Sequence, residues 1–83
     1  MLLQVAMPAR MSQRLPPAQI RRIILELCAD RFLTPAQIGA LMNRNPDRLR
    51  ERFLAPMAHE GLLQMRFPQE RNRPDQAYMT RTP

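Results

Sequence analysis

Two helix-start signals in close succession constrain this chain more than any other feature. Residues 34–37 (Thr-Pro-Ala-Gln) combine a capping threonine, a proline in the first turn and a glutamine that can reach back to the cap. Residues 45–48 (Asn-Pro-Asp-Arg) again combine a cap with a proline. The stretch between the two signals therefore has room for one short helix and a tight turn, which is the layout of a helix-turn-helix.

Three helices are predicted, near residues 17–30, 35–43 and 46–60. The first carries an apolar stripe at helical spacing, formed by Ile20, Ile23, Ile24, Leu27 and Cys28. In the third, Leu49, Phe53 and Met57 share one face, with Leu54 at its edge. Pro56 lies inside this helix and should kink it, because proline cannot donate to the carbonyl one turn earlier.

Gly61 follows the third helix and is suited to a left-handed cap. Beyond it, residues 62–67 and 77–82 read as antiparallel strands around a polar loop bounded by Pro68 and Pro74. A short extended piece at residues 31–33 would form a first strand. The predicted fold is α+β, a winged helix-turn-helix in which three helices precede a β-hairpin wing.

The 83 residues allow one domain at most. We assign residues 16–83 to the winged-helix domain. Residues 1–15 lack a helical or strand period and are expected to form a flexible leader or the end of a linker. The predicted core consists of Ile20, Ile24, Leu27, Ile38, Leu41, Leu49, Phe53, Leu63 and Tyr78, and Cys28 should pack beside it as a small hydrophobe.

The charge of the chain is positive and comes from arginine alone. There are 13 basic residues, none of them lysine, against 7 acidic residues, and the net charge is +6. Such an excess favours a polyanionic partner such as nucleic acid. The alternative is that the arginine content reflects genomic base composition and a solvated surface.

The candidate nucleic-acid-binding residues lie in the turn, on the third helix and in the wing. They are Arg44, Arg48, Arg52, Arg66, Arg71 and Arg73. A helical wheel places the two on the third helix opposite its apolar face, where they can enter a major groove. Two alternatives stay open for this face: Asp47 and Glu51 pair with its arginines, or the face docks a protein.

Catalysis, metal binding and membrane insertion are not predicted. A chain without lysine cannot form a phosphate-binding loop of the nucleotide-hydrolase type, which requires Gly-Lys-Ser/Thr, and it cannot form a Schiff base. Ser12, Cys28 and His59 are the single residues of their types, too few for a catalytic triad or a metal site. No cofactor or small-molecule substrate is expected. No apolar run approaches the roughly 20 residues needed to cross a bilayer, and we expect a cytoplasmic protein.

Several short motifs resemble those of a known family. They include Leu33-Thr34, Leu41-x-Asn43-Arg44, Leu49-Arg50, Phe53-Leu54-x-Pro56, Glu60-Gly61-x-Leu63, Phe67-Pro68 and Pro74-x-Gln76-Ala77-Tyr78-x-Thr80. Together they resemble the C-terminal winged-helix segment of bacterial RecG-like, helicase-related proteins, which often carry a Schlafen/AlbA-like divergent ATPase domain upstream. The family often has Asn-His-Pro in the wing, where this chain has Asn-Arg-Pro at residues 72–74.

The resemblance implies a DNA-binding appendage, linked to transcription regulation, without helicase activity of its own. Residues and resemblance together predict a non-enzymatic module that docks its third helix and its wing on duplex DNA. The alternative is a protein-interaction winged helix that forms a homodimer or docks onto a partner ATPase domain.

Overall fold

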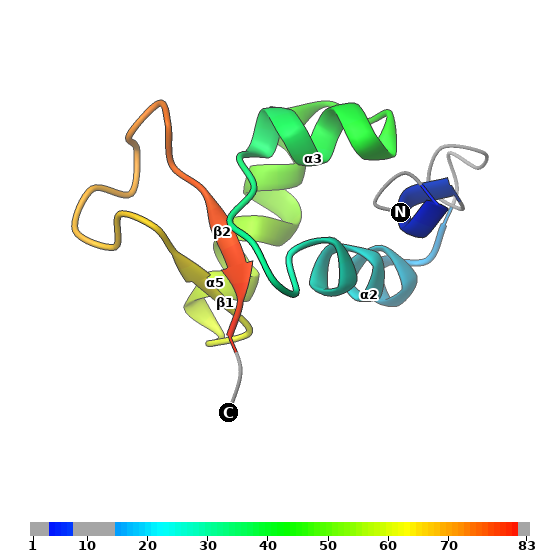
Figure 1. Ribbon diagram of the computed structural model, residues 1–83, viewed down its shortest axis with the longest axis horizontal. Helices are drawn as coiled ribbons and strands as arrows, with labels where there is room; N and C mark the ends of the chain where they lie inside the picture. Colours follow the sequence, from blue (N-terminus) through cyan, green and yellow to red (C-terminus); the bar gives the residue numbers. More distant parts are fainter. Residues whose placement is uncertain (1–3, 8–14, 82–83) are drawn as a thin grey trace.

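A computed structural model of the protein describes residues 4–7 and 15–81 (Figure 1). The chain is α+β. Its elements are α2 (Pro17–Leu27), α3 (Pro35–Met42), α4 (Pro46–Leu49), the π-helical turn η1 (Arg50–Leu54), α5 (Ala55–His59), β1 (Leu63–Met65) and β2 (Tyr78–Thr80). Because α4, η1 and α5 follow one another without a break, we refer to residues 46–59 as helix three. This order of helices and hairpin is compatible with the expected winged helix.

Both predicted helix starts are present. At α3 the Gln37 amide donates to Thr34 Oγ1 over 3.1 Å, and the Thr34 amide donates to Gln37 Oε1 over 2.9 Å. At helix three the Asn45 side chain accepts from the amides of Asp47 and Arg48 over 2.9 and 3.1 Å. These bonds use the N–H groups that a helix start leaves without partners, so local sequence defines where both helices begin.

The disruption expected at Pro56 takes the form of a π-helical turn. The Ala55 amide bonds to the carbonyl of Arg50, five residues earlier, and the extra residue in this turn rotates the following side chains. Leu49 and Met57 of the predicted face are buried, but the prediction for the position between them is wrong. Leu54 is fully buried, whereas Phe53, predicted to be a core residue, is only partly buried.

The hairpin pairs Leu63 with Thr80, Gln64 with Met79 and Met65 with Tyr78, so both strands are shorter than predicted. Gly61 has φ 84° and begins the turn into β1. The amides of Gly61 and Leu62 bond back to the last turn of α5, which is the Schellman pattern of a helix end.

On the other edge of β2, Leu33 and Tyr78 exchange two backbone hydrogen bonds of 2.9 and 2.8 Å. The predicted first strand is thus present as a single antiparallel bridge. This bridge attaches the chain entering α3 to the hairpin, so the sheet holds α2, α3 and the hairpin together.

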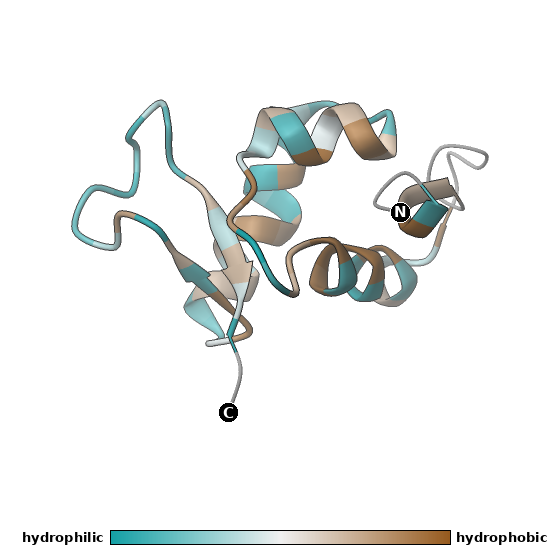
Figure 2. Cartoon of the chain, viewed as in Figure 1, coloured by the Kyte–Doolittle hydropathy of each residue, from teal (hydrophilic) through white to brown (hydrophobic). Residues whose placement is uncertain are grey.

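The core lies between α2, α3, helix three and the hairpin, whose apolar sides face one another (Figure 2). Seven predicted core residues are buried: Ile20, Ile24, Leu27, Ile38, Leu49, Leu63 and Tyr78. Leu41 is only partly buried. Cys28 is fully buried, as predicted. Burial raises the pKa of its thiol to about 12, so the sulfur stays protonated near neutral pH.

Residues 4–7 belong to the segment expected to be a flexible leader or linker end. They are helical, and Ala6 is completely buried against the core. Residues 1–3 and 8–14 of that segment lie outside the described residues, as do residues 82 and 83 at the end of the second predicted strand.

Candidate nucleic-acid interface

The turn before helix three is held tightly against α3. Asn43 adopts a left-handed conformation with φ 55°, and the Arg44 amide bonds to the Gly39 carbonyl over 2.9 Å. A Cβ atom on Gly39 would lie 2.7 Å from the Arg44 carbonyl oxygen and 3.4 Å from Pro46, so this close approach requires glycine. The contact determines how helix three leaves the turn.

Three of the candidate arginines lie on one flank of helix three. Arg44, Arg48 and Arg52 line the same open groove, which has a volume of about 550 Å³. Its apolar lining includes Ile20 from α2 and Phe53, which packs against the core but is only partly buried. The turn and helix three thus gather three guanidinium groups along one side.

The carboxylates of helix three do not neutralise Arg48 and Arg52. Asp47 pairs with Arg50 instead, over a long 3.9 Å. Within residues 4–7 and 15–81, neither Arg48 nor Arg52 forms an ion pair, and neither does Glu51. Arg48, Glu51 and Arg52 are all exposed. The self-pairing that the sequence left open is therefore not seen for these two arginines.

The opposite flank of helix three faces the wing across a second groove of about 370 Å³. Arg50 and Glu51 line it from helix three, Arg71 and Asn72 line it from the wing loop, and Tyr78 contributes from β2. Arg50 was not among the sequence candidates, because an uninterrupted α-helix would turn it toward the apolar edge. Pro56 was the one signal of a changed register.

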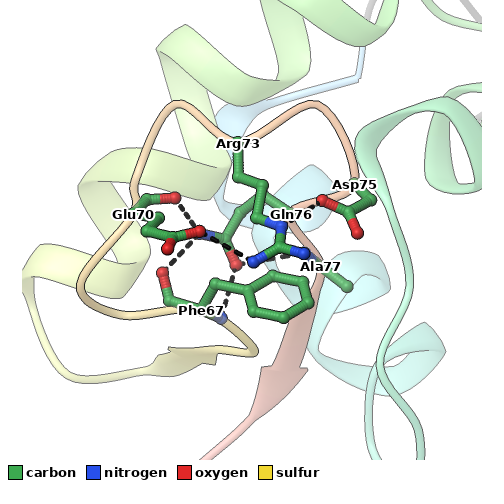
Figure 3. A network of polar contacts seen from close by, with 6 residues as sticks. All are labelled: Phe67, Glu70, Arg73, Asp75, Gln76 and Ala77. Atoms are coloured by element: carbon green, nitrogen blue, oxygen red, sulfur yellow. Dashed lines mark hydrogen bonds and ion pairs between the residues drawn. The ribbon is translucent and has the colours of Figure 1, made fainter.

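In the wing, Arg73 forms hydrogen bonds with carboxylates of its own loop (Figure 3). Its Nη1 donates to Glu70 Oε2 over 2.7 Å and its Nε donates to Asp75 Oδ1 over 2.6 Å. The guanidinium carbon lies 3.9 Å from the centre of the Phe67 ring, which is a close cation–π contact. The hydrogen bonds to Asp75 and Glu70 raise the pKa of Arg73 further above its usual value.

The remaining wing candidates are placed differently. The Arg66 guanidinium lies 5.6 Å from the same Phe67 ring, and Arg71 is exposed and forms no ion pair within the described part of the chain. The six candidates therefore do not form one uniform set: three share a groove beside helix three, Arg71 faces the opposite flank, Arg66 lies near the Phe67 ring, and Arg73 is held inside the loop.

The structural role of Gln76 was not predicted from the sequence. It is only 3% exposed. Its side-chain oxygen accepts from the Phe67 amide over 2.9 Å, and its side-chain nitrogen donates to the carbonyls of Phe67 and Glu70 over 2.8 and 3.0 Å. Nothing in local sequence indicates this role, because it depends on bringing the two ends of the loop together.

No group of three or more His, Cys, Asp or Glu side chains that could hold a metal ion occurs among residues 4–7 and 15–81. In the same residues no helix combines the length and the apolar character that a membrane span requires. Comparisons of the chain with protein-family models, with curated proteins and with solved structures found no match. The function of the site must therefore be inferred from its own geometry.

Proposed function

We propose that the protein is a winged helix-turn-helix module that binds duplex DNA and has no enzymatic activity of its own. The sequence of helices followed by a hairpin supports this fold. The Leu33–Tyr78 bridge supports it further, because it lies where a short first strand would pair. In modules of this kind the second helix of the helix-turn-helix, here helix three, enters the major groove.

The observation that carries the proposal is the unpaired state of Arg48 and Arg52 on helix three. Both belong to exposed residues, and neither has a carboxylate partner in the described chain. A guanidinium offers a planar fork of N–H donors that fits a phosphate or the edge of guanine. Two such groups one helical turn apart form a surface suited to an anion that extends along the helix.

The second flank adds basic residues on the other side of helix three, which suits the two phosphate backbones of a duplex groove. The major groove of B-DNA is about 12 Å wide and admits an α-helix, so that phosphate backbones lie on both sides of the inserted helix. Arg44, Arg48 and Arg52 lie on one side of helix three, and Arg50 and Arg71 line the groove on the other. This arrangement matches two rows of phosphates better than a single acidic patch.

The wider role is also a proposal. We infer that the module is an appendage of a helicase-related or transcription-regulatory bacterial protein of the RecG-like type, acting in the cytoplasm. The support for this is the set of short motifs that resemble the winged-helix segment of that family, of which Gln76-Ala77-Tyr78 lies in the hairpin and Glu60-Gly61 at the end of helix three.

The alternative, a protein-docking winged helix, would require an exposed apolar face. Among the described residues the exposed large hydrophobic side chains are Met7, 38% exposed, and Leu62, 36% exposed. Leu62 lines a groove with Leu25 and Pro17 on the outer side of α2. These exposures are modest, whereas the arginines of helix three are exposed and unpaired, so the surface favours DNA.

A titration of a short fluorescent duplex at low salt, followed by fluorescence anisotropy, tests the proposal. The wild-type protein should bind. Arg48→Ala and Arg52→Ala should each weaken binding about tenfold or more, because a hydrogen bond to a charged group contributes about 1.5–3 kcal/mol.

Arg22→Ala is the matched control, since Arg22 is an exposed arginine that lines the groove on the outer side of α2. It should bind like the wild type. A folded wild-type sample that binds no duplex at low salt would reject the proposal, and a stable dimer in the same sample would favour the docking alternative.

A further inference from the structure

We propose that Arg73 is a positioning residue of the wing: it locks the loop so that Arg71 faces helix three, and it makes no phosphate contact itself. This inference rests on the proposed binding of duplex DNA. It reassigns a residue that sequence alone places among the DNA contacts, and it makes Arg71 the phosphate contact of the wing loop.

The charge around Arg73 argues against a phosphate contact. Its guanidinium donates to two carboxylates, those of Glu70 and Asp75, over 2.7 and 2.6 Å. One positive charge is therefore surrounded by two negative charges, and this cluster has a net charge of −1. A phosphate approaching Arg73 would have to displace both carboxylates or tolerate their repulsion.

The same side chain covers an aromatic ring and so joins separate parts of the loop. Arg73 lies 3.9 Å above the centre of the Phe67 ring, at the start of the loop, while Asp75 binds it near the end (Figure 3). Two ion-paired hydrogen bonds and one cation–π contact thus hold one side chain, and the loop must keep one shape for all three to form together.

Gln76 closes the base of the loop. Beyond the last strand pair, the Arg66 amide bonds to the Ala77 carbonyl over 2.9 Å. The Gln76 side chain then bonds to both the amide and the carbonyl of Phe67. A side-chain amide replaces a backbone pair here, so the two chain segments remain joined past the end of the strands.

Arg71 and Asn72 take no part in the contacts around Arg73. They face helix three across the second groove. Arg50 lines the same groove from the opposite side. A loop that is ordered before binding loses less conformational entropy when DNA arrives. The contribution of Arg73 to affinity should therefore act through Arg71 and vanish when Arg71 is removed.

A double-mutant cycle in the anisotropy titration tests this inference. Arg71→Ala should weaken duplex binding about tenfold and reduce the slope of log K against log salt by roughly one unit. Arg73→Ala combined with Glu70→Gln keeps the net charge of the cluster at −1, and this pair of changes should weaken binding by a smaller factor, about threefold to fivefold, because loop order is lost while charge is kept. Adding Arg71→Ala should give the same affinity as Arg71→Ala alone, since the changes act on one contact.

Additive losses, with the combined variant weakened by the product of the two factors, would overturn the positioning role. A reduction of the salt slope when Arg73→Ala and Glu70→Gln are added to Arg71→Ala would overturn it as well. Absence of wild-type binding would instead reject the proposed function. Amide hydrogen exchange separates local from global effects without DNA: Arg73→Ala should lower protection at Phe67 and Gln76 and leave α3 unchanged. Unchanged protection of the wing amides would also contradict the claim that Arg73 orders the loop.

Discussion

Helix three and the wing both contain arginines, but these arginines differ in whether carboxylates lie close enough to pair with them. Arg48 and Arg52 lie on a helix whose carboxylates do not reach them, and Asp47 pairs weakly with Arg50 instead. Arg73 lies in a loop that supplies two carboxylates and an aromatic ring to one guanidinium. Both regions are positive in sequence, yet among the described residues helix three presents two unpaired arginines, Arg48 and Arg52, whereas the wing loop presents Arg71 and neutralises Arg73. The distribution of partners, more than the number of arginines, decides where an anion can bind.

The largest expected effect concerns the packed side of helix three. Leu54 is fully buried after the π-helical turn, whereas Phe53 is only partly buried. Leu54→Ala should therefore lower the free energy of unfolding by about 2–5 kcal/mol, the usual range for a large side chain removed from a closed core. Phe53→Ala should lower it by less, although phenylalanine is the larger residue. Urea denaturation of both variants measures the difference.

If Phe53→Ala proved more destabilising than Leu54→Ala, the α-helical register predicted from sequence would be the correct one. Arg50 would then turn toward the apolar edge of helix three, and the comparison between the two flanks of helix three would fail.

An intermediate effect is expected in the wing. Gln76→Ala removes the partners of the Phe67 amide and carbonyl, which are only partly exposed. Leaving such groups unsatisfied typically reduces stability by about 1–3 kcal/mol. The loss should be local, so hydrogen exchange should quicken at Phe67 while the amides of α3 keep their protection. An equal change in both places would show that the wing and the helices unfold as one unit.

A smaller effect, common to both regions, is expected at alkaline pH. The folded pKa of Cys28 is about 12, against an ordinary value of 9.0. Between these values the unfolded thiol loses its proton and the folded thiol keeps it, so stability should fall as pH rises from about 9 toward 12. The slope from this group is about 1.4 kcal/mol per pH unit. Burial raises the pKa of Tyr78 as well, in the same direction.

Denaturation of the wild type and Cys28→Ala at pH 8 to 10 measures this contribution, and the variant should lose less stability over that interval. Helix three and the wing should weaken together, because the Cys28 carbonyl accepts from Thr80 of β2 over 2.9 Å and so joins α2 to the hairpin. An alkaline loss identical in the two proteins would contradict the burial of the thiol.

Local sequence was sufficient for the parts of the fold that local chemistry determines. The caps at Thr34 and Asn45 use side chains within three residues of their targets, and Gly61 ends helix three with a positive φ. These features need no tertiary contact, so the helix starts and the position of the hairpin were predicted from residue types and spacing.

Sequence could not resolve features that depend on a rare hydrogen-bond pattern or on distant chain segments. The π-helical turn before Pro56 exchanged the burial of Phe53 and Leu54, and it brought Arg50 to the groove beside the wing. The network around Arg73 forms only when the loop folds back on Phe67. For the candidate site, residue type identified the arginines, but three-dimensional context was needed to separate those with partners from those without.

The most direct test of the central claim is the salt dependence of duplex binding for the wild type and for a variant carrying both Arg48→Ala and Arg52→Ala. If about four or five phosphates are neutralised, the wild-type slope of log K against log salt should be near −4, and the double variant should have a slope near −2, since each lost phosphate contact removes about 0.9. A wild type without measurable binding, or a double variant with the wild-type slope, would contradict the claim that the unpaired arginines of helix three bind DNA.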